Sequence, residues 1–423
     1  MGPWAGDRLG SLLAIASLFV GLCVCQFVAR QFEGESRRRR ILAASLATIG
    51  GVVATDLAQS LSVLVACWMI TSALTVTLLR VSQVTRTAGS SARNAALTFV
   101  TGDSVLLLAT VSTYALHGGP TLTANSFTPV HGVSGILLLM AGTLAAVARA
   151  GLTVRSSWVT ATINAPTSTS ALLHAGVVNA GALLLWRLHE MAGGVAAIDA
   201  ALAIICGAVL VALAPKIHAR VDLKGQLATS TVSQMAFMLL AMALGFPVLA
   251  ISHLIGHGVY KASRFMSAGG AIEQRARLRR RLERGRRLEI FSRGVGAVGL
   301  LGVALLVGTR VHPEGLAAMG VFGPAAAVVW WLRTKSPIRG PLKTWLAEVA
   351  MLIAYAWIVS MVGQYLRPDA VVTGMTSPWW SLGAVTTLVA LRSVRRERAA
   401  MLKTSPSTAR ALRTQSSEDW VAA

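Results

Sequence analysis

The stretch His253-Leu-Ile-Gly-His257-Gly-Val-Tyr-Lys261 lies inside an apolar run that extends from Pro247 to Ala268. Its two histidines and its lysine recur at four-residue spacing, so in a helix they form one stripe that drifts slowly around the axis. The apolar run is about as long as a helix needs to cross a bilayer, where ionisable side chains are costly. The stretch therefore predicts a membrane helix that carries an ion or proton path, or else a buried structural network.

The composition of the whole chain supports a membrane protein. Of 423 residues, 54% are hydrophobic and only 13% are charged, which is typical of polytopic helical membrane proteins and excludes an ordinary soluble domain. The net charge of +22 does not indicate nucleic-acid binding, because Lys and Arg lie mostly in the short gaps between apolar runs. We expect the lipid bilayer to be the environment of the chain.

Hydropathy predicts an all-α protein with about thirteen transmembrane helices. The apolar runs are 12–30, 41–80 (long enough for two short spans), 95–116, 130–163, 167–188, 195–215, 224–244, 247–268, 288–308, 316–332, 342–366 and 379–391. The run 130–163, which is the fifth span because 41–80 counts as two, is too long for one straight crossing, and it predicts a helix that is broken where Arg149 precedes Gly151. Unwound backbone at membrane depth is tolerated only when it is buried or lines a watery cavity, and ion-translocating proteins place sites there.

The basic gaps predict the orientation of the chain. Basic clusters follow the first, third, seventh, ninth, eleventh and thirteenth spans, and the strongest, residues 275–287, has Arg at eight of thirteen positions. The positive-inside rule then places the N-terminus outside and the C-terminus in the cytoplasm. We expect a transmembrane domain over residues 1–391 with a basic cytoplasmic loop at 270–288, and a disordered cytoplasmic tail over 392–423.

Seven ionisable residues remain within the predicted spans once the loops are set aside, and they are the candidate proton pathway. They are Asp103, Arg149, His174, Lys224, His253, His257 and Lys261. Each has a structural alternative: Asp103 could cap a helix or pair with a cation, and Arg149 could be a fixed countercharge because its pKa is above about 12. His174 could be a hydrogen-bonded core residue, and Lys224 could extend to the membrane interface.

Metal binding and catalysis are not indicated for this chain. His253 and His257 have no evident third zinc ligand, and the spacing of Cys23, Cys25, Cys67 and Cys206 fits no zinc or iron–sulfur pattern. The sequence contains no nucleophile triad, phosphate-binding loop or cofactor motif, so we expect no catalysis and no cofactor in this chain alone.

Three stretches together resemble a known superfamily. They are Asn164-Ala-Pro-Thr-Ser-Thr-Ser-Ala-Leu-Leu-His174-Ala-Gly, then Leu223-Lys224-Gly-Gln-Leu-Ala-Thr-Ser-Thr-Val-Ser-Gln, and the His253–Lys261 stretch. In this order they resemble the antiporter-like subunits of respiratory complex I and of Mrp cation/proton antiporters. Within that superfamily, Leu172 to Gly176 and the histidine-rich ninth span look most like the DabB-like membrane subunits of inorganic-carbon transporters.

The resemblance implies an antiporter-like fold with inverted repeats and broken helices, and a proton path along the middle of the membrane. It also implies a bacterial inner-membrane location and a large zinc-containing DabA-like partner related to β-carbonic anhydrases, with zinc in the partner. Proton flow would drive one-way conversion of CO2 to bicarbonate. On the family pattern, Asp103 matches an acidic residue in a Gly-Asp motif, Arg149 matches the Lys of a broken helix, and Lys261 matches the Lys of a later span.

Two departures from the family pattern keep other functions open. Met69 follows Trp68 where many relatives have Glu, and Arg149 keeps the charge of Lys but releases a proton far less readily. The alternatives are a subunit of an Mrp-type antiporter or complex I-like enzyme, and a membrane anchor that conducts nothing.

Overall fold

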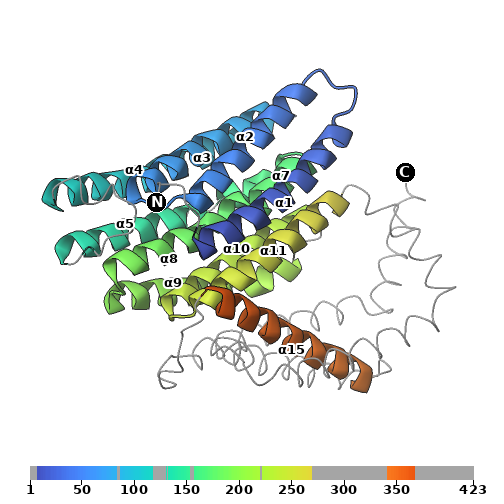
Figure 1. Cartoon of the computed structure of the whole chain (residues 1–423). Helices are drawn as coiled ribbons and strands as arrows, with labels where there is room; N and C mark the ends of the chain where they lie inside the picture. The colour runs from blue at the N-terminus through green and yellow to red at the C-terminus, as the bar shows by residue number, and fades with distance from the viewer. Residues whose placement is uncertain are drawn as a thin grey trace, which may run out of the picture.

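The computed structural model describes residues 7–82, 86–117, 130, 132–152, 157–219, 222–268 and 341–366, and every regular element in these ranges is helical. The long helices are α1 (Arg8–Gln31), α2 (Arg38–Leu57), α3 (Leu61–Val81), α4 (Arg86–His117), α5 (Val133–Arg149), α9 (Ala196–Ala219), α10 (Leu223–Ala243), α11 (Pro247–Ala268) and α15 (Pro341–Leu366). The shorter ones are α6 (Ser157–Ala161), α7 (Thr167–Ala175) and α8 (Ala180–Ala192), with 3-10 turns at Thr162–Asn164 and Val177–Asn179. Figure 1 shows them as one bundle of roughly parallel and antiparallel helices.

Short polar side chains start several of these helices. Asp7, Ser60 and Asp222 precede α1, α3 and α10, and each accepts a hydrogen bond from a backbone N–H in the first turn. Such caps supply acceptors for N–H groups that have no partner inside the helix.

The bundle has the surface of a membrane protein. Among the described residues, six segments are long and apolar enough to cross a bilayer: Arg8–Gln31, Arg38–Leu57, Leu61–Val81, Ser91–Leu116, Thr167–Ala192 and Ala196–Ile217. Large apolar side chains of α1, α4 and α9 face outwards, among them Phe19, Leu108 and Ile204. The all-α membrane fold is thus confirmed. The total of about thirteen spans stays a prediction, since residues 269–340 and 367–423 lie outside the described part.

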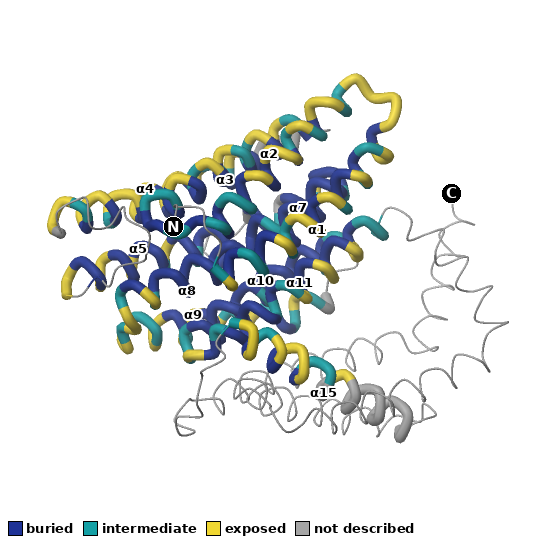
Figure 2. Tube along the Cα trace, in the orientation of Figure 1, coloured by how far each residue is buried: buried dark blue, intermediate teal, exposed yellow. Residues whose placement is uncertain are grey.

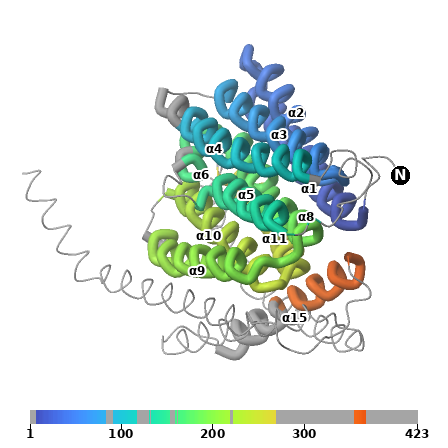
Figure 3. The backbone as a smooth tube through the Cα atoms, turned by 90° about the vertical axis from the view of Figure 1, so that its left-hand side faces the viewer, coloured from blue at the N-terminus to red at the C-terminus, as the bar shows by residue number. Residues whose placement is uncertain are grey.

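The helix α8 occupies the centre of the bundle. In Figures 1 and 3, α5 lies between α4 and α8, and α11 packs against α7 and α10. Figure 2 shows α7 and α8 as almost continuously buried, whereas α4 and α9 have exposed outer faces. Polar side chains on α7 and α11 are therefore shielded from the surface on most sides.

The short turn Gly245-Phe246-Pro247 predicts an antiparallel helix pair, and the packing of α10 on α11 confirms it. Gly245 adopts a left-handed φ of 79°, and the N–H of Phe246 donates to the carbonyl of Ala241, which closes the turn. The seventh span differs from its expected end, because α9 continues through Pro215 to Ala219. A proline this close to a helix end removes only one hydrogen bond.

The chain is interrupted at two places inside the bundle. The first is the expected one: α5 ends at Arg149, Gly151 has a left-handed φ of 73°, and α6 begins at Ser157. The second lies at Gly176, where α7 stops and a 3-10 turn leads into α8. The sequence analysis predicted the sixth span without this break.

Several expectations concern segments outside the described residues. They include the basic loop 270–288, the spans 288–308, 316–332 and 379–391, and the tail 392–423. The domain boundary at residue 391 and the orientation of the termini stay predictions.

Candidate functional site

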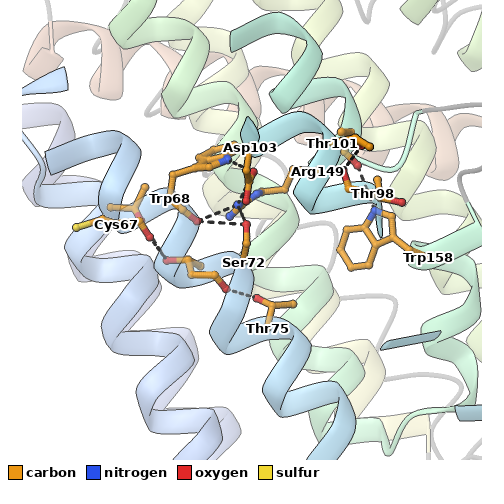
Figure 4. A network of polar contacts seen from close by, with 12 residues as sticks. Cys67, Trp68, Ser72, Thr75, Thr98, Thr101, Asp103, Arg149 and Trp158 are labelled. Atoms are coloured by element: carbon orange, nitrogen blue, oxygen red, sulfur yellow. Dashed lines mark hydrogen bonds and ion pairs between the residues drawn. The ribbon is translucent and has the colours of Figure 1, made fainter. Parts of the chain in front are cut away.

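Arg149 organises the first polar cluster, which we call the Arg149 cluster and which consists of Trp68, Ser72, Asp103 and Arg149. The guanidinium donates to the Trp68 carbonyl at 3.0 Å and to the Ser72 hydroxyl, and it lies 3.7 Å from the Asp103 carboxylate. The Trp68 indole donates to that carboxylate at 2.8 Å. Figure 4 shows the four side chains turned toward one another from α3, α4 and the end of α5.

The cluster keeps Arg149 charged and fixed. Its side chain is 1% exposed, and its guanidinium carbon lies 3.7 Å from the centre of the Trp68 ring. A cation over an indole face and beside a carboxylate is favoured in both contacts. The structure therefore places Asp103 and Arg149 together as an ion pair.

The second cluster, the histidine–lysine cluster, consists of His174, His253, His257 and Lys261. His253 contacts Gln234 of α10 at 2.5 Å and the hydroxyl of Tyr355 of α15 at 3.3 Å. One turn further along α11, the His257 ring centre lies 6.2 Å from that of His253. Helical spacing thus sets the two rings one above the other, as the four-residue period predicts.

Lys261 continues the cluster toward the end of α11. It is 1% exposed, and its ammonium donates to the carbonyl of Leu227 at 2.7 Å and to the hydroxyl of Ser230. Its described partners are neutral oxygen atoms of α10. A buried ammonium held only by neutral oxygens is a group that can give up its proton at modest cost.

His174 joins the cluster from α7, immediately before the break. One ring nitrogen, Nε2, lies 2.9 Å from the Thr162 hydroxyl, and the ring stacks on Phe265 of α11 with centres 4.6 Å apart. The His257 ring also forms a hydrogen bond with the backbone of His174. Residues that are 83 positions apart in the sequence are thus brought together by the packing of α7 on α11.

Lys224 lies at the edge of this cluster. Its ammonium donates to the carbonyls of Ala165 at 2.8 Å and of Ile163 at 3.3 Å, just before α7 begins. The side chain is half-buried at the start of α10. Lys224 therefore holds the chain segment that leads into α7. Its burial is intermediate between that expected of a buried relay residue and that of a residue that extends to the membrane interface.

Aromatic contacts lead from one cluster to the other. Arg149 lies 5.3 Å from the ring centre of Phe99, which packs edge-on against Trp158 at 4.8 Å. Four residues after Trp158, Thr162 contacts His174. The rings of Phe99 and Trp158 therefore lie between the Arg149 cluster and the histidine–lysine cluster. Neither ring titrates, so neither relays a proton.

Several buried polar atoms near the two helix breaks lack a hydrogen-bond partner among the described protein atoms. They are Nδ1 of His174, Nε2 of His257, Oδ1 of Asn179, and Nε and Nη1 of Arg149. Buried polar atoms in native proteins are almost always paired, with ordered water where protein groups are missing. We expect water at these atoms, and water beside imidazole is what a proton path needs.

The polar partners on the neighbouring helices were not predicted from the sequence. Ser230 and Gln234 are four residues apart in α10, so they face α11 together and contact Lys261 and His253. The spacing of these two polar residues in an apolar helix was a signal that could have identified them. Thr162 carries no such signal, because it lies in a 3-10 turn.

Comparison with known proteins assigns the family. Residues 58–332 match the transmembrane family described as NADH:quinone oxidoreductase/Mrp antiporter. The chain belongs to this family. All residues of both polar clusters lie within the matched range. Tyr355, which contacts His253, lies outside it.

Among curated members of the family, proteins named "Probable inorganic carbon transporter subunit DabB" are similar to the chain. That of Bacillus subtilis is 31% identical over 280 residues, covering 64% of this chain and 54% of its own length. That of Hydrogenovibrio crunogenus is 29% identical over 299 residues, covering 67% and 55%. The NAD(P)H-quinone oxidoreductase subunit 5 of Paulinella chromatophora is 38% identical over 138 residues, covering 32% and 20%. The chain spans about half the length of the DabB relatives it matches.

A solved structure confirms the antiporter-like fold. The Mrp complex from Dietzia sp. DQ12-45-1b matches with a TM-score of 0.54 and 18% identity, over 92% of this chain and 44% of the solved chain. At this identity the likeness concerns the fold alone. Together with the family match, it establishes an antiporter-like membrane domain with DabB homologues.

Proposed function

We propose that the chain is the proton-conducting membrane subunit of a two-component, energy-coupled inorganic-carbon uptake system in the bacterial inner membrane. The observation that carries the proposal is the buried histidine–lysine cluster, in a chain whose similar relatives include DabB subunits. Protons move along His253, His257 and Lys261 with His174 beside them. Their flow drives a large DabA-like, zinc-containing partner that converts CO2 to bicarbonate.

The energetic argument for conduction starts from the number of ionisable groups. A charged side chain such as that of Lys261 costs about 2.5–3.5 kcal/mol near the middle of a bilayer, and a chain that only anchored a partner would gain nothing from burying it beside three ionisable imidazoles. Imidazole both accepts and releases protons near neutral pH, so neighbouring rings can pass a proton without a large barrier. The unpaired Nε2 of His257 and Nδ1 of His174 are acceptors available to water.

Asp103 and Arg149 have a different role in this proposal. Arg149 keeps its proton, so the Arg149–Asp103 ion pair acts as a fixed dipole that biases the histidine–lysine cluster across the intervening rings. Lys224 holds the segment before α7 against the start of α10. In the proposed pathway, the histidine–lysine cluster transfers protons, whereas Asp103 and Arg149 keep their charges and Lys224 holds the backbone.

The partner is proposed from the DabB relatives. A cytoplasmic loop at 270–288 with dense Arg would present positive charge to an acidic surface of the partner or to anionic lipid headgroups. Purification of the chain from its native membrane in mild detergent, followed by identification of the co-purified protein, tests this part. A large zinc protein is the expected result, and a set of small antiporter or quinone-oxidoreductase subunits contradicts it.

Proton flux in proteoliposomes tests conduction. The wild-type chain with its partner should acidify the lumen when a gradient is imposed, and Lys261→Ala should abolish this flux. The matched control is Arg264→Ala, because Arg264 is an exposed cation on the same helix. Flux in all three proteins that does not exceed the flux of protein-free vesicles favours the non-conducting anchor, and equal flux above that level shows that Lys261 is not on the path.

The antiporter alternative rests on the fold match to the Mrp complex. An Mrp-type function predicts that flux requires a gradient of sodium or another monovalent cation across the vesicle. Flux that is unchanged when sodium is replaced by choline on both sides argues against it.

A further inference from the structure

Asp56 is a buried carboxyl that the proposed pathway does not use. It lies one residue before the end of α2, is 4% exposed, and accepts a hydrogen bond from the Ser17 hydroxyl at 2.8 Å. The cation that acts on it is Arg187, which is already paired with Asp7 through both terminal nitrogens. Arg187 also lies 3.9 Å from Glu190, so it faces several carboxylates at once. Asp56 is thus left without a full countercharge, and such a carboxyl calls for a proton or a cation.

Asp56 faces a pocket beside the break in the sixth span. The pocket is lined by residues of α1, α2, α8 and α11 and by the broken segment, including Ser17, Asp56, Ala175, Gly176, Asn179 and Gly258. Ala175 directly follows His174, and Gly258 directly follows His257. A β-carbon at Gly258 would lie 2.9 Å from the Ala175 carbonyl, so the glycine allows α11 to approach the broken segment closely. The pocket therefore adjoins the histidine–lysine cluster through Ala175 and Gly258, the residues that follow the two histidines in the chain.

Asn179 is a second, independent indication that the pocket holds a proton donor. Its side chain is 5% exposed, and its amide nitrogen donates to the Ala175 carbonyl at 2.6 Å. Its amide oxygen is buried without a partner. A buried acceptor without a donor costs about 1–3 kcal/mol, so a water molecule or a protonated carboxyl in the pocket is favoured.

The depth of the pocket in the bundle follows from the helix ends nearest to it. The start of α1 and the end of α8 lie at the same end, because Asp7 caps α1 and pairs with Arg187 near the end of α8. At 1.5 Å per helical residue, Ser17 lies about 14 Å from the start of α1, and Asn179 lies about 20 Å from the end of α8. Ser17 and Asn179, which both line the pocket, thus lie about 14 and 20 Å from this end.

We propose that Asp56 is a proton-carrying carboxyl in a hydrated access path from this end of the bundle to the histidine–lysine cluster. The inference rests on the proposed function. It adds Asp56 to the proton pathway and states from which end of the bundle protons enter. A proton from water at the bundle end binds the Asp56 carboxylate and then passes to water that donates to the Asn179 amide oxygen. From there it reaches Nε2 of His257, which becomes imidazolium as Asp56 returns to carboxylate. Only O–H and N–H bonds form and break.

Infrared spectroscopy tests whether Asp56 holds a proton, independently of any transport. The full chain in lipid should show the C=O stretch of a protonated carboxylic acid that shifts in D2O. The band should be lost in Asp56→Asn and kept, at a shifted frequency, in Asp56→Glu. Asp199→Asn is the matched control, because Asp199 is a carboxyl of α9 that pairs with His189 outside the pocket. A band unchanged in Asp56→Asn overturns the inference. Saturable binding of ²²Na⁺ that Asp56→Asn abolishes overturns it as well, since the pocket would then hold sodium.

Proton flux tests whether the held proton is on the path. Asp56→Asn should lower the flux at least about tenfold, whereas Asp56→Glu keeps most of it and Asp199→Asn keeps all of it. Flux that is lost in Lys261→Ala but unchanged in Asp56→Asn overturns this inference and leaves the proposed function intact. If the wild-type chain conducts nothing, the proposed function fails and the access path fails with it. The infrared band then reports only whether Asp56 is protonated.

Discussion

Replacing Asp103 by Asn should destabilise the protein strongly, because it leaves the buried guanidinium of Arg149 without its countercharge. The two groups are 3.7 Å apart, and their side chains are 9% and 1% exposed. At that distance, an effective dielectric constant of about 20 gives an attraction of about 4.5 kcal/mol. Breaking a buried pair by removing one partner typically costs about 3–5 kcal/mol. Asn keeps an oxygen for the Trp68 indole, so the loss of charge is isolated from the loss of that hydrogen bond.

The assay is reversible unfolding in detergent micelles, with the free energy of unfolding measured for each variant. We expect a loss of about 3–5 kcal/mol for Asp103→Asn, and recovery of most of it when Arg149→Met is added, since the double variant has no unpaired charge. The control is Glu35→Gln, which breaks the exposed pair with Arg37 and should change stability by less than about 1 kcal/mol. If Asp103→Asn unfolds like the wild type, or if Arg149→Met fails to rescue it, the Arg149 cluster is not held as described.

Three further predictions concern other parts of the structure. Gly151→Ala should destabilise the protein by about 1 kcal/mol or more in the same unfolding assay, because φ is 73° and the new β-carbon would lie 2.4 Å from a methyl group of Val159. Stability equal to that of the wild type would show that the chain between α5 and α6 relaxes freely. Burial alone raises the pKa of Asp7, which lies before α1, but the hydrogen bonds and charge of Arg187 outweigh it and hold that pKa below the ordinary 3.8. A lowered folded-state pKa contributes stability above pH 3.8 that is lost as the pH falls through the folded value, so Asp7→Asn should flatten the acid limb of a stability–pH curve. Phe265→Ala should cost about 3–5 kcal/mol and should reduce flux, because the buried ring stacks on His174; unchanged flux would separate the stacking from conduction.

The regular features of the fold were accessible from the sequence because each leaves a local signal. The spans follow from runs of apolar residues, the turn before α11 from Gly245 and Pro247, and the end of α5 from the length of the run around Arg149. The break at Gly176 was not predicted, since the residues on both sides are apolar and the run has the normal length of one crossing. The interruption is set by packing, with Gly258 of α11 pressed against the last carbonyl of α7.

The candidate site was predictable where its residues share one helix, but not where different helices bring them together. The stripe on α11 follows from four-residue spacing, and the structure brings His174 to it from α7. The pairing of Asp103 with Arg149 joins two helices that spacing within one helix cannot connect. The same holds for Asp56, whose neighbourhood is formed by α1, α8 and α11 as well as by its own helix.

The central claim, that proton flow through this chain drives the partner, is tested most directly on the purified complex in proteoliposomes. Bicarbonate formation from CO2 is followed with and without an imposed proton gradient, for the wild type and for Lys261→Ala. The account predicts that the gradient accelerates bicarbonate formation in the wild type, and that an uncoupler or Lys261→Ala removes the acceleration while the complex stays assembled. Gradient-dependent formation that persists in Lys261→Ala would contradict it.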